Sequence, residues 1–235
     1  MRIVELLNEE SMTVNKKLNP VLWNGGELKS EITEKLIEIA KVFQEFIGVE
    51  LDVADYTLTG SNANFTWTEY SDLDLHIIVR GMPSDEQREL YNAKKALWAE
   101  EHNIRIKNLP VECYIQGAKE PHHSTGVYSL SKNTWLIEPK KVKPNINDAA
   151  VQAKKDSIQH DIEASLISKD LPKMRLAKQK LTKMRKAGLE RAGEYSVENI
   201  VFKQLRNLGM IDQLSTEIRE LEDEQLSLEQ APELV

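Results

Sequence analysis

Two short stretches of the sequence decide the fold: LTGS at residues 58–61 and, after ten intervening residues, DLDLHIIV at residues 72–79. In the second stretch, apolar residues alternate with Asp72, Asp74 and His76. An alternation with a period of two is typical of a β-strand that buries one face against a core. The sequence therefore predicts a strand whose other face presents two carboxylates close together.

The turn before this strand has residues that suit a phosphate-binding loop. Gly60 lacks a Cβ, so the backbone there can turn sharply and approach a ligand closely. Ser61 offers a hydroxyl and an amide that can hold phosphate oxygens. Asp72 and Asp74, about 7 Å apart along a strand, repel each other unless a cation lies between them. Oxygen-ligated Mg²⁺ is the usual cation at such sites, and Mn²⁺ is an alternative.

A third carboxylate, Glu112, lies between Val111 and Cys113 in a later stretch that alternates in the same way. We therefore expect Glu112 to project from the polar face of the same sheet. When two metals assist a displacement, one orients a triphosphate and the other lowers the pKa of the attacking hydroxyl. We interpret Glu112 as a ligand of the second metal or as the base that accepts the proton of that hydroxyl.

These features follow a recognisable order along the chain: the glycine–serine pair at 60–61, the ten-residue gap, the two aspartates in an apolar strand and the later glutamate. This order resembles that of the nucleotidyltransferase superfamily typified by DNA polymerase β, over roughly residues 28–139. The resemblance implies a mixed β-sheet flanked by helices. It also implies Mg²⁺ held by the two aspartates, a nucleotide bound at the glycine and the serine, and a metal or base role for the glutamate.

The same resemblance implies an enzyme that moves a nucleoside monophosphate from an NTP, with ATP among the expected donors, to a hydroxyl and releases pyrophosphate. The acceptor stays open among a nucleic-acid 3′ end, a nucleotide, a protein and a small molecule; no membrane partner is expected. Two alternatives also stay open: a catalytically inactive module of this fold that binds nucleotide or nucleic acid, and a pyrophosphotransferase related to the alarmone synthetases. The whole chain further resembles uncharacterised bacteriophage members of the superfamily. Asn64 and Phe65 stand where arginine and glycine are frequent in relatives.

The order of strand-like and helix-like patterns predicts an α+β fold followed by a helical region. An N-terminal arm is expected over residues 1–27, a nucleotidyltransferase-like catalytic domain over 28–142 and an all-helical domain over 143–235. The boundary follows from Pro139 and Pro144, since the pattern is helical beyond them.

Turn-forming residues predict two further interruptions of regular structure. A hairpin over residues 104–116 is expected to turn at residues 108–110. The last helix, from Ser196 to about Gln230, is expected to break at Gly209.

A basic segment between Lys169 and Arg191 contains nine basic residues and two acidic ones. Within it, we nominate Lys178 and Lys186 as contacts for the triphosphate tail or for a polynucleotide acceptor. The alternative is a solvated helix face that balances the acidic C-terminal stretch.

The overall composition sets the class of protein. The chain has 235 residues, 40% of them hydrophobic, and a net charge of −7, which excludes wholesale disorder and collagen-like repeats. Its single cysteine, Cys113, cannot form an intramolecular disulfide, which fits a reducing compartment. No apolar run of membrane-spanning length and no secretory signal are evident. The expected location is the cytoplasm, including that of a phage-infected bacterial host.

Overall fold

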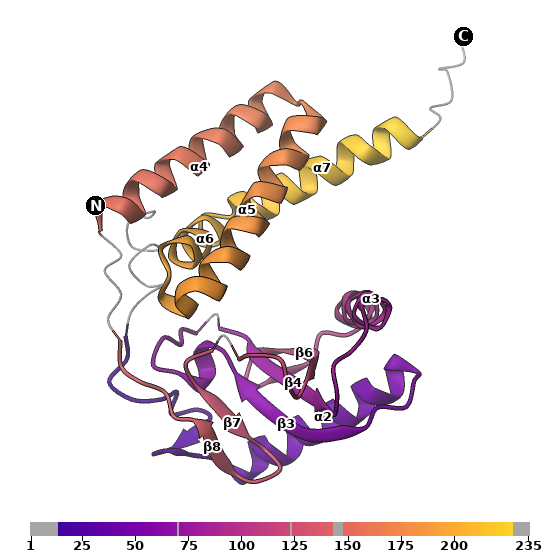
Figure 1. Cartoon of the computed structure of the whole chain (residues 1–235), viewed down its shortest axis with the longest axis vertical. Helices are drawn as coiled ribbons and strands as arrows, with labels where there is room; N and C mark the ends of the chain where they lie inside the picture. Colours follow the sequence, from indigo (N-terminus) through magenta and orange to yellow (C-terminus); the bar gives the residue numbers. More distant parts are fainter. Residues whose placement is uncertain (1–13, 70, 123, 143–147, 228–235) are drawn as a thin grey trace. The chain divides into compact units, whose positions relative to one another are not determined.

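The computed structural model describes residues 14–69, 71–122, 124–142 and 148–227. Contacts within the described chain separate it into an α+β unit, residues 14–142, and a helical unit, residues 148–227 (Figure 1). The predicted α+β fold followed by a helical region is therefore confirmed. None of the helices in the described residues is long and apolar enough to cross a membrane.

The α+β unit is built on a six-stranded mixed sheet. Its strands, in spatial order, are β5 (Arg105–Ile106), β6 (Leu109–Gly117), β4 (Leu73–Val79), β3 (Val53–Thr59), β7 (Val127–Ser129) and β8 (Thr134–Ile137). The central strands β4 and β6 are parallel, and the other neighbouring strands are antiparallel. A parallel pair needs a long crossover, and helix α3 (Asp85–Glu101) provides it.

One face of the sheet is apolar and packs against helix α2 (Ser30–Ile47). Figure 1 shows this helix lying along the sheet. The buried side chains that make this core include Leu36, Ile39 and Phe43 of α2 and Leu73, Leu75, Ile77 and Cys113 of the central strands. Burial raises the pKa of the Cys113 thiol to about 12, so this cysteine is an inert core residue. Because strand side chains alternate, the polar residues of β4 and β6 project from the opposite face.

The segment before α2 is part of this core. Residues 1–13 of the expected arm lie outside the described residues, but Leu18, Leu22 and Trp23 are buried. Strands β1 (Trp23–Asn24) and β2 (Glu27–Leu28) form a two-stranded hairpin in this segment. The described part of the expected arm therefore packs as an integral piece of the α+β unit.

The hairpin between β5 and β6 turns earlier than the sequence predicts. Its two-residue loop is Lys107–Asn108, and both residues have positive φ angles, 50° and 68°. Positive φ at both positions is what a tight two-residue hairpin loop requires, and asparagine tolerates it well. The expected turn at residues 108–110 is thus wrong by one residue at its start and by two at its end, because Pro110 is compatible with the start of a strand.

The helical unit contains four helices: α4 (Ala149–Ser168), α5 (Leu171–Ala192), α6 (Val197–Asn207) and α7 (Met210–Leu226). The expected break at Gly209 is confirmed, since this glycine has a φ of 72° and separates α6 from α7. Apolar side chains from all four helices form a second core, with Ile162, Met174, Val201 and Leu214 almost fully buried.

A buried carboxylate links three helices of this unit. Glu198, in the first turn of α6, accepts hydrogen bonds from Lys154 of α4 at 2.6 Å and from Arg191 of α5 at 2.8 Å. The hydrogen bond from Lys154 is the largest cause that lowers the pKa of Glu198, which falls to about 2. The ionised carboxylate therefore stabilises the packing of these helices.

Replacing this carboxylate should make the stability of the helical unit less dependent on pH. At pH 7, the free energy of unfolding of the Glu198→Gln variant should be about 1–2 kcal/mol lower than that of the parent chain. The folded pKa is depressed, so this contribution is complete above the ordinary carboxyl pKa and disappears as the pH falls to about 2. Urea unfolding followed by circular dichroism at several pH values measures it, with exposed Glu190→Gln as the matched control. If the free energies of unfolding of the variant and the parent chain differ by the same amount at pH 2 as at pH 7, the stabilising role of the ionised Glu198 is contradicted.

Candidate active site

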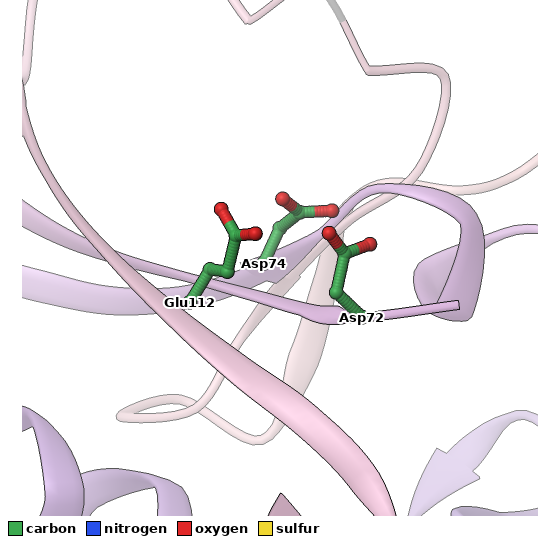
Figure 2. Close-up of side chains that lie close together, drawn as sticks. All are labelled: Asp72, Asp74 and Glu112. Carbon is green, nitrogen blue, oxygen red and sulfur yellow. The ribbon is translucent and has the colours of Figure 1, made fainter. Parts of the chain in front are cut away.

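Three carboxylates meet on the polar face of the sheet. Asp72 lies directly before β4, Asp74 lies within β4, and Glu112 is its register partner on the parallel strand β6. One carboxylate oxygen from each residue lies within 4.8 Å of the other two. Figure 2 shows the three side chains rising from the strands on the same side. The sequence-predicted acids are therefore brought together, and each is only partly buried.

The donor set of this cluster fits a divalent metal ion. Three anionic groups this close repel one another strongly unless a cation neutralises them. Carboxylate oxygens are the ligands that Mg²⁺ and other hard divalent cations prefer. Asp72, Asp74 and Glu112 would hold such an ion.

Gly60 lies against this cluster, where no other residue type would fit. It has a φ of 76° and a ψ of −161°, a conformation essentially restricted to glycine. A Cβ built at this position would overlap the Asp74 carboxylate. The glycine is therefore required both by its backbone conformation and by the close approach of Asp74.

Ser61 begins a short 3₁₀ turn, η1 (Ser61–Ala63), and is partly exposed. Its side chain makes no hydrogen bond to any residue that the structure describes. The adjacent Gly60 amide instead donates to Ser124 Oγ at 3.2 Å. The Ser61 hydroxyl is thus a group of this turn that is available to a ligand.

Asn62 fixes the turn to the start of β4. Its side-chain amide donates to the carbonyls of Ser71 at 3.1 Å and Asp72 at 2.8 Å. Its own carbonyl groups accept from residues of the N-terminal segment, with Asn19 donating to the side-chain oxygen at 2.9 Å and Trp23 to the backbone oxygen at 2.8 Å. Fully buried Asn62 therefore sets the distance between the glycine–serine turn and the first aspartate.

Asn64 also has a structural contact in this loop. Its side-chain amide donates to the hydroxyl of Thr125, in the loop between β6 and β7. Asn64 is fully buried, and its side chain holds two loops together.

Two donors converge on the third carboxylate. Tyr114 Oη donates to Glu112 Oε2 at 2.6 Å, and Lys95 Nζ lies 3.0 Å from the same oxygen. Burial raises the pKa of Glu112, but the hydrogen bond from Tyr114 and the charge of Lys95 outweigh it, and the pKa falls below its ordinary value. Burial, followed by the neighbouring acids, raises the pKa of Tyr114, so the phenol remains a donor at neutral pH.

His76 continues the polar row beyond the carboxylates and is uncharged at neutral pH. Burial lowers its pKa to about 4, and its Nδ1 lies 2.8 Å from Gln116 Oε1. Its ring stacks on Tyr114 with centroids 4.8 Å apart. His76 therefore supports the tyrosine and adds no charge to the site.

Two predicted nucleotide contacts lie in the other unit. Lys178 and Lys186 belong to α5 of the helical unit, and their role in binding nucleotide stays a prediction.

Sequence reasoning missed Asn62, Lys95 and Tyr114. Tyr114 was within reach of that reasoning, because it follows Glu112 by two residues and so shares its face. Lys95 carried no such signal, since it resembles the other lysines of a charged helix.

The comparisons agree with this geometry. Residues 31–124 match the family described as Nucleotidyltransferase domain, and this span contains the turn and all three acids. A solved structure, the STING-associated CdnE c-di-GMP synthase from Capnocytophaga granulosa, is similar at 13% identity with a TM-score of 0.24, over 95% of this chain and 100% of that one. A TM-score this low carries no argument, so the functional assignment rests on the family match alone. No curated protein matches the chain.

Residues 31–124 of the α+β unit are thus similar to the nucleotidyltransferase domain, and this similarity assigns the chain to the transferases. The domain implies an NTP substrate and the transfer of a nucleoside monophosphate, and such enzymes typically use divalent metal ions. Neither finding bears on a bacteriophage origin, which stays a prediction.

The contact between Gly60 and Asp74 predicts that even a methyl group will disturb the metal site. Gly60→Ala should displace the Asp74 carboxylate and weaken the binding of Mn²⁺ at least about tenfold. Electron paramagnetic resonance of free Mn²⁺ measures this affinity. Gly81→Ala is the matched control, because Gly81 also has a positive φ, 87°, while a Cβ there meets no atom within 4 Å. Equal Mn²⁺ affinity of the two variants would contradict the prediction.

Proposed function

We propose that this enzyme transfers a nucleoside monophosphate from an NTP to a hydroxyl acceptor in a Mg²⁺-dependent reaction that releases pyrophosphate. The observation that carries the proposal is the cluster of Asp72, Asp74 and Glu112 beside the glycine–serine turn, within the part of the chain that matches the nucleotidyltransferase family. The bond that forms joins the acceptor oxygen to the α-phosphorus. The bond that breaks joins this phosphorus to the oxygen that leaves with pyrophosphate.

The residues of the site would have different roles in this reaction. Asp72 and Asp74 would hold metal next to the turn, where the Ser61 hydroxyl could contact the triphosphate. When bound, divalent metal neutralises the charge of the triphosphate and lowers the pKa of the attacking hydroxyl. Glu112 completes the ligand set on the neighbouring strand. Because Glu112 Oε2 already accepts from two donors, the geometry favours a ligand role over that of a proton acceptor.

Positioning and electrostatics would supply most of the rate acceleration. The proposed reaction needs no nucleophile from the protein, since the acceptor hydroxyl attacks directly. The rigid sheet holds the acids in place, and the buried Asn62 holds the turn against them. A pre-organised arrangement of this kind lowers the barrier without reorganisation at the moment of reaction.

The identity of the acceptor and the donor base can be tested with labelled nucleotides. The full chain is incubated with each NTP, labelled at the α- or γ-phosphate, and with RNA, nucleotides, protein and small alcohols as acceptors. Transfer of the α-label with release of pyrophosphate supports the proposal. Release of AMP with transfer of the terminal phosphates would instead indicate a pyrophosphotransferase, and binding without any release would indicate an inactive binding module.

Removing a metal-binding carboxylate should abolish turnover while leaving the fold intact. Asp72→Asn and Asp74→Asn should each lower the rate at least about a thousandfold, because the amide cannot neutralise the cation. Pyrophosphate release measures the rate, and circular dichroism checks the fold. Asp52→Asn is the matched control, because Asp52 is an exposed acid of the same unit that pairs with Arg80. Retention of full activity by either active-site variant would refute the assignment.

The Ser61 hydroxyl should contribute to binding of the triphosphate more than to the chemical step. Ser61→Ala should raise the KM for the NTP about tenfold, the effect of losing one hydrogen bond to a charged group. Steady-state kinetics with varied NTP measures this change. An unchanged KM would show that the hydroxyl does not contact the triphosphate.

A further inference from the structure

Helix α3 brings a lysine to the third carboxylate. Lys95 lies on the crossover between β4 and β6, and only 28% of its side chain is exposed. Its ammonium lies 3.5 Å from the centre of the Tyr114 ring and 3.0 Å from Glu112 Oε2. The neighbouring Lys94 points elsewhere, over the Phe46 ring at 5.1 Å. Of these two adjacent lysines, Lys95 is therefore the one directed at the site.

Two side chains pack against the ring of Tyr114. His76 stacks on its ring at 4.8 Å with an interplanar angle of 23°, and Lys95 lies against the same ring. Gln116 in turn holds His76 by a hydrogen bond of 2.8 Å. The Tyr114 hydroxyl is thus aimed at Glu112 by a packed row of side chains.

Both donors bind the same oxygen of Glu112. A carboxylate has two oxygens, and because Tyr114 and Lys95 both contact Oε2, the second oxygen would be available to a metal ion. Glutamate has one more rotatable bond than aspartate, so ordering it costs more conformational entropy. Repulsion from Asp72 and Asp74 would also favour rotamers that point away from the cluster.

We propose that Lys95 and Tyr114 are positioning residues, which fix Glu112 through Oε2 so that its carboxylate joins Asp72 and Asp74 in binding metal. This inference rests on the proposed function for its catalytic meaning, but the alignment of Glu112 can be measured without catalysis. Neither residue needs to touch the NTP or the acceptor. Groups that orient a metal ligand commonly change metal affinity or activity by about 10–100-fold when removed.

The metal-binding experiment tests the alignment by itself. Tyr114→Phe keeps the ring that His76 and Lys95 pack against and removes only the hydroxyl, with no change of charge. We expect this variant to bind Mn²⁺ about tenfold more weakly than the parent chain in calorimetric titrations without nucleotide. Unchanged Mn²⁺ affinity would overturn the proposal. This readout stands even if the chain shows no transfer of nucleotide, which would count against the proposed function alone.

The kinetic experiment separates positioning from substrate binding. We expect Lys95→Met and Tyr114→Phe each to lower kcat about tenfold and to change the KM for the NTP less than twofold. Lys95→Arg should recover most of the rate, since it restores a cation on the same helix. Lys94→Met, the matched control, should behave as the parent chain.

Two kinetic results would overturn the proposal. A rise in KM without a fall in kcat would show that Lys95 binds substrate phosphate. Residues that act on one oxygen should have less than additive effects on the activation free energy in the Lys95→Met/Tyr114→Phe double variant. If the losses in kcat of the two single variants instead multiply fully, the two residues act independently.

Discussion

The mutual repulsion of three carboxylates is the constraint around which the α+β unit is organised. One oxygen from each acid lies within 4.8 Å of the others, so each pair is unfavourable by about 1 kcal/mol or more even in water and by several times that when partly buried. The parallel register of β4 and β6 fixes Asp74 opposite Glu112, and Asn62 fixes Asp72 through its backbone carbonyl. The apolar face of the same strands, buried against α2, supplies the stabilisation that keeps these strands in register.

Each acid is restrained in a different way, according to the length of its side chain. The short side chain of Asp74 is confined by the close approach of Gly60. The longer side chain of Glu112 accepts hydrogen bonds from two donors. A conformation available only to glycine thus lies directly beside the group that would bind the ion. The arrangement holds negative charge together before any cation arrives, which is what pre-organisation requires.

Local patterns in the sequence predict which side chains share one face of the sheet, and contacts between distant segments explain what those patterns miss. The period of two around Asp74 and Glu112 places both on one face, because side-chain direction in a strand depends only on the local backbone. The crossover through α3 makes the two strands parallel neighbours and brings Lys95 to Glu112. The local sequence of either strand does not indicate these contacts. The predicted hairpin loop extends two residues too far for a similar reason: the local sequence around Pro110 is typical of a turn, but Pro110 pairs with Arg105 in the sheet.

Contacts of the N-terminal segment extend the core of the α+β unit beyond the family-matched residues. Trp23 stacks on Trp135 at 4.7 Å and donates to the Asn62 carbonyl, although both tryptophans lie outside the family-matched span of residues 31–124. A fragment trimmed to that span would leave the buried oxygens of Asn62 without donors and would also lose β7 and β8 from the sheet. The family-matched span and the segment that completes the core therefore have different limits, and the second includes residues on both flanks of the first.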